Sequence, residues 1–162
     1  MKTIKLIAGI FTYIAISACG NTVSDTQSPS KVKESVVEAK VEQATKFYDL
    51  TLEEAIEKAK KEDKYVFVSF YTKTCAPCKK MKATVLATSE CGEYINEHFI
   101  PIMIDGEDEG IGTEIAKKYE VYIFPTHMIL LPNGTKEGEV LGAEYDVNKF
   151  LGMLKTIIHD NQ

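Results

Sequence analysis

The sequence lacks arginine. All 19 basic residues are lysines, and 24 acidic residues leave a formal net charge of −5 over 162 residues. An acidic chain without guanidinium groups binds a phosphate backbone poorly, so nucleic acid is excluded as the main partner. Four cysteines are too few for a disulfide-rich scaffold but enough for one reactive pair. With 44% hydrophobic residues and no internal repeat, the chain predicts one packed domain with room for an appended segment.

The N-terminus has no apolar run long enough to span a bilayer. The run from Leu6 to Ile16 covers 11 residues, about half of what a transmembrane helix needs. Lys2 and Lys5 precede it and small residues lead into Cys19, an arrangement typical of a signal peptide. The segment resembles a bacterial lipoprotein signal, although Ile16 stands where that family usually has leucine. The resemblance implies cleavage after residue 18, a lipid anchor on Cys19, and a place in the bacterial cell envelope facing the periplasm or the exterior.

The segment from residue 19 to residue 46 is predicted to be a flexible linker. Beyond the cysteine it is rich in Ser, Thr, Lys, Glu and Val and has no large aromatic residue or leucine. A flexible coil of this length reaches on the order of 30 Å. The sequence therefore predicts a signal peptide over residues 1–18, a lipidated linker over 19–46 and a folded domain over 47–162.

The folded part alternates helical and strand patterns. Thr51 followed by Glu54 forms a capping box that begins a helix ending near Asp63. Strands are predicted over Tyr65–Phe70, Phe99–Ile104, Thr126–Leu131 and Glu139–Leu141, and further helices after Cys78, over Ser89–His98 and Thr113–Tyr119, and from Val147 to Ile158. Helices between strands favour parallel pairing, and the Asn133-Gly134 turn favours a hairpin. We expect an α/β fold with a mixed central sheet and helices on both faces.

The turn Cys75-Ala76-Pro77-Cys78 carries the predicted chemistry. A thiol attacks a disulfide only as the thiolate, which positive potential stabilises. Unpaired backbone N–H groups at the start of a helix supply such potential, and Pro77 is suited to a helix start. We expect Cys75 to be partly exposed and nucleophilic, and Cys78 to lie deeper and to resolve a mixed disulfide.

These residues resemble the thioredoxin family over roughly residues 47–161. The resemblance includes the strand over Tyr65–Phe70, the Cys-Ala-Pro-Cys turn followed by Lys79, the stretch from Val121 to Thr126, and the Asn133-Gly134 hairpin. More narrowly, it looks like the exported thioredoxin-like domains related to thiol:disulfide interchange proteins. A C-x-x-C motif alone is a weak signal, but a preceding strand, a following helix and a downstream Phe-Pro-Thr make it specific.

The resemblance implies a thiol:disulfide oxidoreductase that acts on exported proteins. It implies that Pro125 is cis and exposes the backbone of Phe124 to an extended substrate, with Thr126, Ala76 and Pro77 completing the binding site. The Ala-Pro dipeptide resembles that of reducing members more than that of oxidising ones, so reduction of exported proteins is the expected direction. No prosthetic group is expected, since the Cys75–Cys78 pair carries two electrons. The expected partners are exported proteins, a membrane electron donor or a thiol oxidant, and the membrane itself; the protein is expected to be a monomer.

Two positions depart from the family pattern. Thioredoxins carry a buried carboxylate six residues before the first cysteine, where this chain has Ser69, and a tryptophan directly before it, where this chain has Thr74. The first departure leaves open how Cys78 loses its proton. The second leaves open how the surface around Cys75 receives a partner.

Other chemistries remain as alternatives. Cys75 and Cys78 could form part of a zinc or copper site with Cys91, His98 or His127, although a strand–turn–helix context supplies no second pair of ligands. A non-catalytic binding module is a third class. Cys91 is expected to be a small buried hydrophobe rather than an oxidation-sensitive thiol. The run Asp105–Gly110 has a calcium-loop pattern but Ala116 at its twelfth position, so an acidic turn is expected.

Overall fold

The computed structural model describes residues 44–159. The predicted signal peptide over residues 1–18, the lipidation site Cys19 and nearly all of the predicted linker lie outside the described residues. Within residues 44–159, no helix has the length and apolar character needed to cross a membrane.

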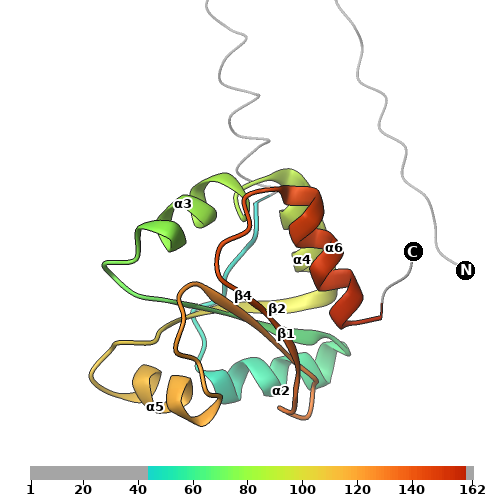
Figure 1. Cartoon of the computed structure of the whole chain (residues 1–162). Coiled ribbons are helices and arrows are strands. Elements are labelled where there is room, and N and C mark those ends of the chain that lie inside the picture. The colour runs from blue at the N-terminus through green and yellow to red at the C-terminus, as the bar shows by residue number, and fades with distance from the viewer. Residues whose placement is uncertain (1–43, 160–162) are drawn as a thin grey trace, which may run out of the picture. The chain divides into compact units, whose positions relative to one another are not determined.

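Four strands form one mixed sheet, in the order β2-β1-β3-β4. β1 pairs parallel with β2 and antiparallel with β3, and β3 pairs antiparallel with β4. Helices cover both faces of the sheet (Figure 1). The elements are α2 (Leu52–Glu62), β1 (Tyr65–Tyr71), α3 (Ala76–Thr84), α4 (Ser89–His98), β2 (Phe99–Asp105), α5 (Ile111–Lys118), β3 (Thr126–Leu130), β4 (Lys136–Leu141) and α6 (Val147–Ile157). The predicted α/β fold with a mixed central sheet is confirmed.

β1 is buried on both faces, as its continuous apolar pattern predicts. Val66, Val68 and Phe70 pack against α2 and α5, whereas Phe67 on the other face packs against α3, α4 and α6. Burying one such side chain fully contributes about 1.5–3 kcal/mol. The two apolar clusters fix the helices on opposite faces of the sheet, and thereby fix where each strand-to-helix turn emerges.

Two predicted boundaries are corrected. The helix predicted from Thr113 begins at Ile111, because the N–H of Glu114 already donates to the carbonyl of Gly110. The hairpin strand predicted from Glu139 begins at Lys136, which pairs with Leu130. The turn between these strands is closed by the N–H of Leu131 donating to the carbonyl of Thr135, and Gly134 has a φ of 84° that favours glycine.

The segment before α2 lies along the edge of the sheet. The N–H of Thr45 donates to the carbonyl of Leu86, and the N–H of Lys46 donates to Oδ1 of Asn96. Tyr48 makes a parallel bridge to Ile102 of β2. The predicted boundary between linker and domain after residue 46 therefore falls inside a stretch that is hydrogen-bonded to the domain.

Candidate active site

Cys75 and Cys78 form a disulfide where β1 leads into α3. Their Cα atoms are 5.3 Å apart. Cys75 is the N-cap residue of α3 and is partly exposed, whereas Cys78 lies in the first turn and is only 8% exposed. The structure thus places one sulfur at the surface and the other behind it, as the sequence predicts.

The backbone of α3 faces Cys75 with hydrogen-bond donors. The N–H of Cys78 donates to Sγ of Cys75 over 3.1 Å, which is the N-cap interaction of the helix. The first turn of α3 carries no acidic residue, and Pro77 occupies an early position where a backbone N–H is not needed. When the disulfide is open, the same donors and the helix dipole stabilise a thiolate at Cys75 more than one at Cys78.

The Phe124–Pro125 peptide bond is cis, as the resemblance implies. It lies at the same end of the sheet as the disulfide, because Thr126 pairs with Phe70 shortly before β1 enters the Cys75 turn. The hydroxyl of Thr126 donates to the carbonyl of Ile123 over 2.8 Å, which closes this turn. Within residues 44–159 the backbone of Phe124 has no hydrogen-bond partner, so its N–H and carbonyl are available to an incoming strand.

Exposed apolar side chains surround this end of the sheet. Tyr122 and Ile123, directly before the cis peptide, are 75% and 54% exposed. On the other side Leu141, which is 58% exposed, pairs with Thr126, and the next N–H, that of Gly142, donates to the carbonyl of Pro125. We call Tyr122, Ile123, Leu141 and Tyr145 the apolar collar.

Leu141 and Tyr145 were not predicted from the sequence to be site residues. The structure connects Tyr145 to α3, since Nζ of Lys80 lies 4.2 Å from the centroid of its ring. The predicted antiparallel hairpin could have indicated their position, because it places the end of β4 beside the start of β3. The chain has no tryptophan before Cys75, and an aromatic side chain from a different part of the sequence stands beside α3 instead.

Beneath α3, Ser69 and His127 pair across β1 and β3. Both are buried, and Ser69 occupies the position where thioredoxins have a carboxylate. Nε2 of His127 lies 3.2 Å from Sδ of Met81, which is one helical turn after Cys78. Nδ1 of His127 is buried without a hydrogen-bond partner. Complete burial lowers the pKa of His127 to about 3, so this imidazole is neutral at neutral pH.

The donors required for a metal site are not assembled. Cys91 is fully buried in the apolar cluster of α3, α4 and α6, and His98 ends α4 at the opposite end of β2 from the active site. Across the described part of the chain, no three His, Cys, Asp or Glu side chains are placed to hold a metal ion. Burial also raises the pKa of the Cys91 thiol, which makes it a poor ligand and a poor nucleophile.

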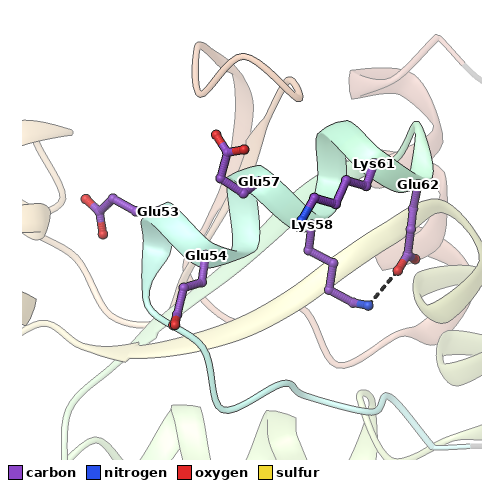
Figure 2. Close-up of a pocket in the computed structure, with 6 residues that line it drawn as sticks. All are labelled: Glu53, Glu54, Glu57, Lys58, Lys61 and Glu62. Atoms are coloured by element: carbon purple, nitrogen blue, oxygen red, sulfur yellow. Dashed lines mark hydrogen bonds and ion pairs between the residues drawn. The ribbon is translucent and has the colours of Figure 1, made fainter.

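Two groups of acidic residues lie away from the Cys75–Cys78 disulfide. In the turn after β2, the N–H of Glu107 donates to Oδ1 of Asp105, and the Thr113 hydroxyl donates to the carbonyl of Asp108. A surface hollow on α2 is lined by the charged side chains labelled in Figure 2, where Lys58 and Glu62 form an ion pair. Because α2 packs on the sheet face opposite to α3, this hollow takes no part in the disulfide site.

Comparison with known proteins agrees with this geometry. The model of a thioredoxin-like domain matches residues 52–158. The chain belongs to the thioredoxin-like family. The solution structure of a putative disulphide-isomerase from Bacteroides thetaiotaomicron is similar with a TM-score of 0.65 and 33% identity, over 74% of this chain and 97% of that one. A thioredoxin from Echinococcus granulosus is 32% identical over 90 residues, which are 56% of this chain and 77% of that protein.

Another relative is much longer. Spermatogenesis-associated protein 20 of Rattus norvegicus is 34% identical over 74 residues, which are 46% of this chain but only 9% of that protein. The chain therefore spans a small part of this curated relative. The predicted family is confirmed, and the predicted enzyme class, a thioredoxin-like thiol:disulfide oxidoreductase, is that of the family.

Proposed function

We propose that this protein reduces disulfides in exported proteins, using Cys75 as the nucleophile and Cys78 as the resolving thiol. The observation that carries the proposal is the asymmetry of the pair: Cys75 is partly exposed at the N-cap of α3, and Cys78 is buried behind it. Ala76 and Pro77, both exposed, separate the two and face the solvent with Cys75.

In the first step the Cys75 thiolate attacks one sulfur of the substrate disulfide. A bond forms between Cys75 Sγ and that sulfur, the substrate S–S bond breaks, and the other substrate sulfur leaves as a thiolate that takes a proton from water. The backbone N–H of Cys78, which donates to Cys75 Sγ in the disulfide form, stabilises the attacking thiolate.

In the second step Cys78 loses its proton and attacks Sγ of Cys75. The Cys75–Cys78 bond forms, the mixed disulfide breaks, and the second substrate sulfur leaves as a thiol after protonation. Two electrons have then passed from the dithiol to the substrate. No prosthetic group is required for this exchange.

The cis turn positions the substrate. The free backbone groups of Phe124 pair with an extended substrate segment, which brings its disulfide to Cys75. Thr126 supports this geometry by its bond to Ile123, and the apolar collar contributes contact area on both sides.

We infer the location from the N-terminal sequence, which resembles a lipoprotein signal. A lipid on Cys19 would hold the domain in the bacterial cell envelope, facing the periplasm or the exterior. Each turnover leaves the dithiol oxidised, so an electron donor must reduce it again, and we propose that this donor lies in the membrane; a thiol oxidant in that place would drive the reaction in the opposite direction. We propose that the protein works as a monomer.

The proposal is tested by reduction of insulin with the full-length protein and dithiothreitol as the electron source. We expect turnover by the wild type, and loss of at least a hundredfold in Cys75→Ser, since the nucleophile is removed. In cells, Cys19→Ser should move the protein from the membrane fraction to the soluble fraction. A Cys75→Ser variant as active as the wild type would refute the role of the dithiol, and unchanged fractionation would refute the anchor.

A further inference from the structure

Charge is divided between the two sides of the disulfide. α3 carries Lys79, Lys80 and Lys82 and no acidic residue, which gives this helix a net charge of +3. The loop between β2 and α5, residues 106–110, has exposed carboxylates at Glu107, Asp108 and Glu109 and no basic residue, a net charge of −3. We call residues 106–110 the acidic loop.

The fold places these charges on opposite flanks of the reactive sulfur. β1 and β2 are parallel neighbours that end in register, Tyr71 against Asp105. From this end one connection leads to α3 on one face of the sheet and the other leads to α5 on the opposite face (Figure 1). A partner chain that lies over Cys75 and runs from one face of the sheet to the other therefore has α3 on one side and the acidic loop on the other.

The acidic loop packs against the cis turn at Phe124–Pro125. The ring of Phe124 packs so closely on Gly106 that a Cβ added there would lie 2.4 Å from Cε1 of the ring. At the base of the loop, Asp105 is already paired with Lys73, whose Nζ lies 3.6 Å from Oδ2. Within residues 44–159, the carboxylates of Glu107, Asp108 and Glu109 make no ion pair and remain for a partner.

Exposed apolar side chains lie beside the acidic loop. Tyr122 and Ile123 of the apolar collar are more than half exposed, next to Phe124 and hence next to the acidic loop. Exposed apolar side chains beside a reactive group mark a contact surface, and the charges that border it select the partner and its orientation.

We propose that the partner is an extended protein segment with basic side chains on one flank of its target cysteine and acidic side chains on the other. The basic flank lies over the acidic loop and the acidic flank lies over α3. Because pairing with the backbone of Phe124 fixes the chain direction, only one order of flanks along the partner sequence fits. This inference rests on the proposed function and adds the chemistry of its substrate.

The experiment uses three homodimeric peptide disulfides with the same apolar residues beside the cysteine. The first has three lysines before the cysteine and three glutamates after it, the second has the reverse order, and the third has glutamines on both flanks. The full-length protein, with dithiothreitol as electron source, should reduce one charged order roughly tenfold faster than the other at low ionic strength. The preference should disappear in 0.5 M salt, where exposed charges are screened within about 4 Å.

Two double variants test whether the acidic loop causes the preference for one order of charged flanks. Glu107→Lys with Glu109→Lys changes the charge of the acidic loop from −3 to +1 and should abolish the order preference while the glutamine peptide is still reduced. The matched control is Glu93→Lys with Glu97→Lys on α4, the same change in charge at exposed positions. α4 ends where β2 begins, at the opposite end of the strand from the acidic loop, so this control should keep the preference.

Two results would overturn the inference and leave the proposed function standing. One is equal reduction of the two charged orders, within twofold, at low salt. The other is an order preference that survives in the loop variant. Failure to reduce any of the three peptides, including the glutamine peptide, would contradict the proposed function and this inference with it.

Discussion

Nε2 of His127 lies 3.2 Å from Sδ of Met81, one helical turn along α3 from Cys78. The imidazole also stacks on Phe67, with ring centroids 5.3 Å apart, and meets Phe150 edge to face at 5.2 Å. A neutral aromatic base thus lies under the active-site helix, next to the buried Ser69 that replaces the acid of thioredoxins. Neither His127 nor Ser69 therefore places a negative charge beneath α3.

The pH dependence of stability should reveal the buried imidazole. Burial lowers the pKa of His127 to about 3, whereas an unfolded histidine has a pKa of about 6.5. Between these values the unfolded state binds more protons, so the contribution of the neutral imidazole is complete above pH 6.5 and is lost as the pH falls toward 3. We expect urea unfolding to show a loss of about 2–3 kcal/mol from this group between pH 7 and pH 4.5.

The variant His127→Leu isolates this contribution, because leucine keeps an apolar side chain at the site and does not titrate. Its free energy of unfolding should fall less than that of the wild type over the same pH interval. The matched control, His98→Gln at the end of α4, should follow the wild type. Parallel pH profiles for His127→Leu and the wild type would show that burial does not hold His127 neutral.

Gly106→Ala should impair the reduction of protein substrates. Its Cβ would lie 2.4 Å from Cε1 and 2.6 Å from Cζ of Phe124, so the ring and the attached cis turn must shift. We expect KM for a protein disulfide to rise about tenfold, since small displacements of a positioning group are costly, while a small-molecule disulfide is reduced at nearly the wild-type rate. Gly152→Ala is the control, since a Cβ at this position of α6 meets nothing within 4 Å. Equal KM values for the two variants would contradict the positioning role of Phe124.

Much of this arrangement could be predicted from the sequence, because its signals are local. The Thr51 and Glu54 capping box, the apolar run of β1 and the Cys75-Ala76-Pro77-Cys78 helix start each depend on neighbours within a few residues. The contact between His127 and Met81, and the approach of Tyr145 to Lys80, join residues 46 and 65 positions apart. Such contacts follow from the register of β3 and β4, which the sequence did not specify at the level of single side chains.

Cys91 should be inert in the folded protein. It is fully buried and its pKa is raised by that burial, so it has neither the exposure nor the ionisation that a reactive thiol needs. In the reduced native protein, iodoacetamide should modify Cys75 first, and Cys91 only after urea is added, as located by peptide mass mapping. Cys91→Ala should retain the wild-type rate of disulfide reduction. Modification of Cys91 at the rate of Cys75 would point instead to a third reactive thiol.

Thr51→Ala should destabilise the domain without affecting the chemistry. The Thr51 hydroxyl accepts the N–H of Glu54, and the Glu54 carboxylate accepts the N–H of Thr51. The N–H of Thr51, and in second place its hydroxyl, donate to the Glu54 carboxylate and lower its pKa. Loss of the N-cap should cost about 1 kcal/mol in urea unfolding, and Thr51→Ser should restore most of it. Because α2 packs on the face opposite to α3, the rate of disulfide reduction below the unfolding range should stay unchanged.

The proposed exchange mechanism depends most on which sulfur first bonds to a substrate. Cys78→Ser keeps the exposed sulfur at the N-cap and removes the one that resolves the intermediate. Incubated with a protein disulfide, the full-length Cys78→Ser variant should accumulate a mixed disulfide through Cys75, identified by mass spectrometry, whereas Cys75→Ser should accumulate none. A folded Cys78→Ser protein without an adduct, or an equal yield of adduct through Cys78 in Cys75→Ser, would contradict the assignment of Cys75 as the nucleophile.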